Sequence, residues 1–237
     1  MEREFGIKNK KIYIIYFILA CISFAILVML LTGGFFNNYF NWLTYFNAFK
    51  LVSIILVLLY IVTRLDGFKR LLTRRLIFKD ELLYMFIFGI IGIFATYLGM
   101  DYYNALISVR NLLPTIGGLL GGPIIGTGSG LIAGIYRILM GDPLAIAGGV
   151  GTIFAGLIAS IIYSLNDGKF IGVFESVCLA GLLEGLRLFI YLILPVTGYG
   201  PALSVIAGVW APVVFANMIG MLIFVLMIFK DIQYYNA

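Results

Sequence analysis

The stretch LLPTIGGLLGGPIIGTGSGLIAGIYRILM, residues 112–140, decides how this chain is organised. It is apolar throughout, yet it is longer than the roughly 20 residues that an α-helix needs to cross about 30 Å of hydrocarbon. Pro123 lacks a backbone N–H and disfavours helical geometry at the preceding residue, Gly122. We therefore expect a sharp turn at Gly121, Gly122 and Pro123, with a membrane helix on each side of it.

The same stretch carries a small residue at every fourth position, and such spacing lets helix backbones approach closely. These positions are Gly118, Gly122, Gly126, Gly130 and Gly134. The main interpretation is tight helix packing. The alternative is a crowded core that brings the backbone close to a ligand.

The composition of the whole chain shows which solvent it faces. Hydrophobic residues make up 62% of the 237 residues and charged residues only 11%, against about 45–50% and about 25% in soluble proteins. Mean hydropathy is +1.09. A soluble enzyme is therefore excluded. The chain has no histidine, and its two cysteines show no metal-ligand spacing. We expect no catalytic site, no metal and no cofactor in this segment.

Further apolar stretches are long enough to be membrane spans, and basic residues flank the early ones. The stretches are residues 12–31, 48–62, 82–99, 148–165, 170–194 and 205–229. Basic clusters lie at 3–11 and at 64–79. By the positive-inside rule these clusters face the cytoplasm. They indicate membrane orientation and not nucleic-acid binding.

The number of crossings decides where the later charges lie. If 112–140 crosses once, Lys230 ends outside, on the wrong side for a basic residue. If the chain turns back at Gly122, Lys230 lies inside, and Arg110 and Arg137 both lie near the outer face. We therefore predict an all-α polytopic protein of the bacterial plasma membrane with about seven to eight membrane helices and cytoplasmic termini.

Charged residues near the membrane are costly unless they are used. Arg110 stands just before the helix expected from Leu112, and Arg137 ends the next one. A further helix, expected to begin at Gly148, opens with GGVGT, which ends at Thr152. Two guanidinium groups with two helix N-termini would bind a small carboxylate or phosphate. The alternative is that the arginines pair with nearby aspartates or reach lipid headgroups.

Three polar residues of the last two spans have supporting roles in this hypothesis. Glu184 and Arg187 are three residues apart on one helix face and, in one interpretation, neutralise each other. In the alternative, Glu184 holds Arg137 or Arg110 in place. Asn217 is a hydrogen-bonding candidate across helices. Tyrosines near loop ends indicate an interfacial belt.

The run from Asn104 to Gly156 resembles the LytS–YhcK-type five-transmembrane receptor domain. The resemblance rests on the N-x-x-x-x-x-R start, the GLLGGP turn, the G-x-x-x-G-L-x-x-G-x-x-R helix and the small-residue stretch before TIFAG. In this chain these are Asn104 with Arg110, Gly118–Pro123, Gly126 to Arg137, and 147–156.

The resemblance implies a membrane sensor domain that precedes a histidine kinase or a diguanylate cyclase. Some receptors of this kind bind pyruvate with two arginines, which match Arg110 and Arg137. They also use a Cys and a Ser, which correspond here to Gly148 and Gly151. This difference leaves a small anion as the expected ligand and does not support pyruvate.

The resemblance also orders the domains. Residues 1–47 are an added first helix and outer loop, 48–230 the sensor domain, and 231–237 the start of a cytoplasmic signalling helix through which a homodimer would form. We expect the output domain after residue 237. The helix plan is also similar to the substrate-binding S-components of vitamin transporters, so a solute-binding transport subunit is the alternative function.

Overall fold

The computed structural model describes residues 42–73, 75–102, 104–194 and 199–236. The expected helix over 12–31 lies outside these residues. The elements in chain order are α2 (Trp42–Thr63), α3 (Asp66–Leu72), α4 (Phe78–Tyr97), β1 (Met100–Tyr102), β2 (Ala105–Ile107), α5 (Leu112–Leu139), α6 (Ala145–Leu165), α7 (Val173–Ile193) and α8 (Tyr199–Asn236). The expected domain boundary after residue 47 falls inside α2.

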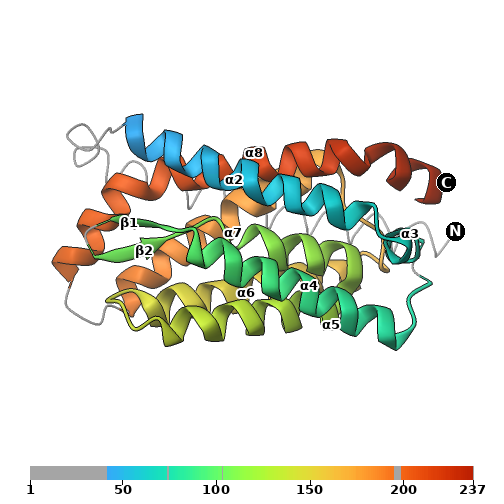
Figure 1. Ribbon diagram of the computed structural model, residues 1–237, viewed down its shortest axis with the longest axis horizontal. Coiled ribbons are helices and arrows are strands. Elements are labelled where there is room, and N and C mark those ends of the chain that lie inside the picture. The colour runs from blue at the N-terminus through green and yellow to red at the C-terminus, as the bar shows by residue number, and fades with distance from the viewer. Residues whose placement is uncertain (1–41, 74, 103, 195–198, 237) are drawn as a thin grey trace, which may run out of the picture.

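The long helices run lengthwise beside one another as a bundle (Figure 1). Five of the described helices are long and apolar enough to cross a membrane: Trp42–Thr63, Leu112–Leu139, Ala145–Leu165, Val173–Ile193 and Gly208–Phe229. The prediction of a polytopic helical membrane protein is therefore confirmed. The prediction of seven to eight spans is not confirmed, because the described residues show five candidates.

Large apolar side chains are exposed along the outer faces of the bundle, as contact with lipid requires. They include Val57, Ile61, Phe86, Ile90, Phe154, Ile161, Phe215 and Leu226. Several polar and charged side chains are instead buried, among them Arg110, Arg137, Glu184 and Arg187, which is the reverse of the arrangement in a water-soluble protein. The apolar outer surface of the bundle is therefore suited to contact with lipid.

α5 is broken at the position where the sequence predicts a turn. Gly122 has φ 75° and ψ −155°, a conformation outside the helical region, and Pro123 follows it. A Cβ on Gly126 would lie 2.8 Å from the backbone nitrogen of Gly118, whereas eight residues of straight helix would separate the two by about 12 Å. The second half of α5 therefore folds back along the first, and the broken-helix prediction is confirmed.

Glycines allow the close approach of α5 and α6. A Cβ on Gly134 would lie 2.7 Å from the carbonyl oxygen of Gly149, and one on Gly118 would lie 2.9 Å from the backbone nitrogen of Ser160. Cβ atoms essentially never come this close to backbone atoms. The regular glycine spacing thus serves helix packing, as its main interpretation predicts.

The break in α5 and the charged residues lie at opposite ends of the bundle. At one end, Gly121 is next to Leu71 of α3, and Gly122 is next to Tyr163 near the end of α6. At the other end, Arg137 bonds to the carbonyl oxygen of Leu106 in β2. Figure 1 shows α3 and the β-hairpin at these two ends.

The hairpin is an element that the sequence reasoning missed. β1 and β2 are antiparallel, with Met100 opposite Ile107 and Tyr102 opposite Ala105. Strands of three residues are too short to show an alternating pattern, so no periodicity signal exists for them. The hairpin packs onto α8, where a Cβ on Gly208 would collide with the ring of Tyr102. Because Ser108 and Arg110 directly follow β2, the hairpin positions them.

Candidate ligand-binding site

Arg110 is buried between β2 and α5 and has no carboxylate partner among the described residues. Its Nε donates to Oγ1 of Thr152 at 2.9 Å, and its Nη1 donates to Oγ of Ser108 at 2.7 Å. Its Nη2 is buried without a hydrogen-bond partner in the described structure. Removal from water lowers the pKa of the Arg110 guanidinium to about 9. The side chain therefore holds a fixed position with one donor unused.

Arg137, in the last turn of α5, is equally buried but is paired. Both of its terminal nitrogens donate to the carboxylate of Asp142, and Nη2 also donates to the carbonyl oxygen of Leu106 at 3.2 Å. Its Nε is buried without a partner in the described structure. The alternative of an arginine–aspartate pair thus holds for Arg137 with Asp142.

The two unused donors meet at Gly148. A Cβ on this glycine would lie 2.7 Å from Nη2 of Arg110 and 3.3 Å from Nε of Arg137. It would also lie 3.3 Å from the hydroxyl of Tyr191. Three polar groups, from the segment after β2, from α5 and from α7, therefore converge on a position that carries no side chain.

The backbone of Gly148 does not act as the sequence predicts. α6 begins at Ala145 and not at Gly148, because Asp142 starts the helix: its carbonyl and carboxylate oxygens accept from the N–H groups of Ala145 and Leu144. The N–H of Gly148 consequently bonds to the carbonyl oxygen of Leu144 at 2.8 Å. The expectation of a reachable N–H at Gly148 is wrong, and the arginines supply the free donors.

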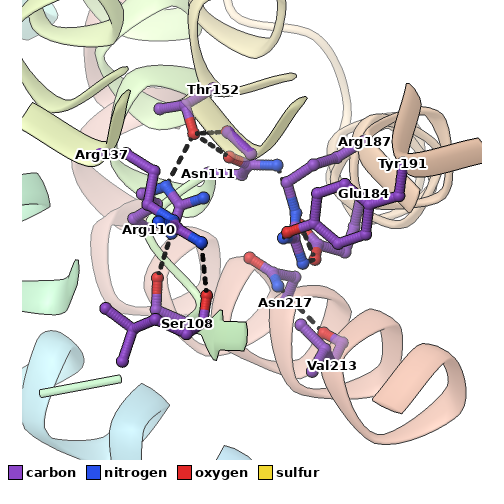
Figure 2. Close-up of polar contacts among 12 residues, drawn as sticks. Ser108, Arg110, Asn111, Arg137, Thr152, Glu184, Arg187, Tyr191, Val213 and Asn217 are labelled. Carbon is purple, nitrogen blue, oxygen red and sulfur yellow. Dashed lines mark hydrogen bonds and ion pairs between the residues drawn. The ribbon is translucent and has the colours of Figure 1, made fainter. Parts of the chain in front are cut away.

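Asn111 links the arginine region to the next helix, and the sequence reasoning did not single it out. Its Nδ2 donates to Oε2 of Glu184 at 2.9 Å, and its Oδ1 accepts from the hydroxyl of Thr152 at 2.8 Å. Its only sequence signal is a polar residue beside Arg110 at the start of an apolar helix. Asn111 connects residues of α5, α6 and α7 in one buried network (Figure 2).

Glu184 and Arg187 neutralise each other, which is one of the two alternatives that the sequence left open. Both are fully buried. Nε of Arg187 donates to Oε1 of Glu184 at 2.9 Å, and Nη2 donates to the same oxygen. Nη1 of Arg187 donates to the hydroxyl of Tyr191. Tyr191 is therefore a member of the cluster and not of an interfacial belt.

The charges of this cluster do not balance. It contains the three guanidinium groups of Arg110, Arg137 and Arg187 against the two carboxylates of Asp142 and Glu184. All but Asp142 are fully buried, and Asp142 is mostly buried. An uncompensated buried charge is costly. The cluster can be completed by one negative charge.

The other predicted residues make no hydrogen bond to the free arginine nitrogens in the described structure. Asn104 is exposed at the hairpin turn with φ 60°, a conformation that asparagine tolerates. Gly151 faces α7, where a Cβ would lie 2.6 Å from Cγ of Arg187. Asn217 bonds within its own helix, to the carbonyl oxygen of Val213, and not across helices.

The class of protein follows from these features: a multi-pass helical membrane domain with a buried, positively charged cluster at one end. Among the described residues, no group of His, Cys, Asp and Glu could hold a metal ion. The family is shown by comparison. The chain belongs to the five-transmembrane receptor family 5TMR-LYT, because the family model described as the 5TMR of 5TMR-LYT matches residues 65–231.

The curated relatives are sensor proteins. The sensor protein LytS of Oceanobacillus iheyensis is 28% identical over 76% of this chain and 34% of its own length. The sensor histidine kinase BtsS of Escherichia coli is 25% identical over 73% of this chain and 32% of its own. The chain thus spans about a third of the length of these relatives. No solved structure matches it. The sequence-based assignment to the LytS type is confirmed.

Proposed function

We propose that this chain is the ligand-binding membrane domain of a two-component sensor and that its ligand is a small monoanion, most simply a carboxylate. The observation that carries the proposal is the pair of unused donors, Nη2 of Arg110 and Nε of Arg137, which both face Gly148. A buried donor without a partner costs about 1–3 kcal/mol. A carboxylate oxygen between the two nitrogens would satisfy both.

The charge of the cluster supports an anion of charge −1. Three arginines face two carboxylates, so one negative charge completes the balance. A dianion would leave an excess of negative charge in a region shielded from water, which is unfavourable. A cation would add to the existing excess of positive charge.

Binding of a ligand to this cluster would require movement of an element that covers the arginines. Arg110 and Arg137 are fully buried, so a ligand reaches them only if a covering element moves. The β-hairpin is one such element, because the carbonyl oxygen of Leu106 in β2 accepts from Arg137. Entry of the ligand would shift the hairpin relative to α8, on which Tyr102 packs at Gly208. Such a shift is a physical route from binding to signalling.

The test of ligand binding is calorimetry on the purified chain with a panel of monocarboxylates, dicarboxylates, phosphate and neutral analogues. Arg110→Ala and Arg137→Ala should weaken binding of the best monocarboxylate by about ten- to a hundredfold, since a charged hydrogen bond contributes about 1.5–3 kcal/mol. Arg64→Ala is the control, because Arg64 is exposed and bonds to Tyr60. A neutral or cationic best ligand would show that the proposal is wrong.

Membership of the 5TMR-LYT family favours the sensor over the alternative of a transport subunit. The test is a chimaera in which this chain replaces the aligned part of the sensor protein LytS of Oceanobacillus iheyensis. Autophosphorylation that depends on the added carboxylate supports a sensor. Accumulation of labelled carboxylate in cells, without any effect on phosphorylation, supports a carrier.

A further inference from the structure

Asn217 of α8 has a hydrogen-bond acceptor, Oδ1, without a partner in the described structure, and it lies in the part of the bundle that holds the arginine cluster. Its side chain is buried, with 1% of its surface exposed. Nδ2 donates to the carbonyl oxygen of Val213 at 2.9 Å, and Oδ1 has no partner in the described structure. A carbonyl oxygen can only accept, so the atom next to Val213 must be the amide nitrogen. The oxygen is therefore the atom left over.

The packing of α8 places this oxygen beside the arginine cluster. One turn further along α8, a Cβ on Gly220 would lie 2.8 Å from Cδ2 of Leu112, the residue after Asn111. Met218 packs on α7, where a Cβ on Gly181, one turn before Glu184, would lie 2.9 Å from the Met218 sulfur. Asn217 thus stands where α8 faces both Asn111 and Glu184. Figure 2 shows its amide between Arg110 and the Glu184–Arg187 pair.

The unpaired Oδ1 of Asn217 needs the opposite kind of hydrogen-bond partner from the arginine nitrogens. The arginine nitrogens require an acceptor such as a carboxylate, whereas Oδ1 of Asn217 requires an O–H or N–H donor. A buried acceptor that stays unpaired weakens binding of any ligand without that donor. The ligand that satisfies all three atoms carries a carboxylate and a donor group together.

The charge of the cluster distinguishes between the two common donors. A protonated amine would add a positive charge where three arginines already exceed two carboxylates. A hydroxyl donates a hydrogen bond without charge. From these observations we propose that the site is selective for a small hydroxy acid and that Oδ1 of Asn217 accepts a hydrogen bond from the hydroxyl of this acid. This inference rests on the proposed anion site.

The experiment compares four acids of one carbon skeleton by calorimetry on the purified chain: lactate, propionate, pyruvate and alanine. They differ only at the second carbon, which carries a hydroxyl, hydrogen, a keto oxygen or an ammonium group. Lactate should bind about tenfold more tightly than propionate, because only lactate pairs with Oδ1. Pyruvate should also bind more weakly than lactate, since its keto oxygen is a second acceptor. Alanine should bind more weakly than lactate because of its ammonium charge.

The variant Asn217→Leu removes the acceptor and keeps the volume similar. It should bind lactate and propionate equally, with propionate bound at least as tightly as by the wild type, and this second result shows that the fold is intact. Met218→Leu is the matched control on the same turn of α8 and should keep the preference for lactate.

Each outcome separates the two proposals. Equal binding of lactate and propionate by the wild type overturns the role of Asn217 and leaves the anion site standing. Tightest binding of alanine or pyruvate overturns the hydroxyl preference, as does a preference for lactate that survives Asn217→Leu. If the wild type binds none of the four acids, both the anion site and the hydroxyl preference fail.

Discussion

Arg110 and Arg137 turn unused nitrogens toward the same glycine: a Cβ on Gly148 would lie 2.7 Å from Nη2 of Arg110 and 3.3 Å from Nε of Arg137. Two like charges that approach each other in a buried region are unfavourable without a counter-charge. Asp142 compensates Arg137, but no described carboxylate compensates Arg110. This relationship is the basis for expecting an anion, and it leads to the following predictions.

Gly148→Ala should block the site without unfolding the protein. The added Cβ would occupy the position that both arginine nitrogens face, and its three nearest neighbours all belong to side chains and not to the backbone. We expect binding of the best carboxylate to weaken by at least about tenfold, equivalent to about 1.4 kcal/mol. Gly185→Ala is the control, because nothing lies within 4 Å of a Cβ there. Unchanged calorimetric affinity in Gly148→Ala would place the ligand elsewhere.

Arg110→Lys should recover only part of the binding that Arg110→Ala loses. Lysine keeps the charge but has no planar group of several donors, so it cannot hold Ser108 and Thr152 while also binding the ligand. We expect an affinity between those of the wild type and the alanine variant. Full recovery, measured by the same titration, would show that charge alone matters at this position.

Glu184→Gln should destabilise the protein strongly. It leaves Arg187 fully buried without its carboxylate, and breaking a buried pair in this way costs about 3–5 kcal/mol. The Tm of the purified chain in detergent should fall. Replacing both partners, as in Glu184→Gln with Arg187→Met, should restore part of the loss. The affinity for the anion should change less than in Arg110→Ala, because Glu184 reaches the site only indirectly, through Asn111 and through Arg187 with Tyr191.

Gly134→Ala should destabilise the α5–α6 contact. The new Cβ would lie 2.7 Å from the carbonyl oxygen of Gly149, which is backbone and cannot move aside alone. Overpacking of this kind costs about 1–3 kcal/mol. In the matched variant Gly185→Ala the Cβ meets open space, and the Tm should hold or rise, since alanine favours helix over glycine. Equal Tm values in the two variants would contradict close packing at Gly134.

The β-hairpin should face outward and the α6–α7 loop inward. The basic residues described at 64–79 lie next to α3, at the end away from the hairpin, and the positive-inside rule places that end in the cytoplasm. Single cysteines at the exposed positions Asp101 and Lys169 test this, in a chain whose two natural cysteines are replaced. A membrane-impermeant thiol reagent added to intact cells should label position 101 only. Labelling of position 169 instead would invert the orientation.

The membrane class, the break at Gly122 and the role of the regular glycines were readable from the chain alone. Each depends on local chemistry: apolar length, the missing N–H of Pro123, and the small volume of residues spaced one helical turn apart. Arg110 and Arg137 could also be singled out, because charge in an apolar context is conspicuous. The orientation and the proposed role of the arginines remain predictions.

The amino-acid sequence does not show which polar atoms form hydrogen bonds with each other and which remain without a partner. Thr152, Glu184 and Asn217 stand far from Arg110 along the chain, and their neighbourhood arises only when α5, α6, α7 and α8 pack together. Asn111 and Tyr191 were missed for the same reason, since a polar side chain near a helix end looks alike whether it is buried in a network or exposed. Hydrogen-bond balance is a property of the packed bundle, because each donor is satisfied or left over by side chains from other helices. The unpaired nitrogens at Gly148 and the unpaired oxygen of Asn217 were therefore decided by tertiary structure.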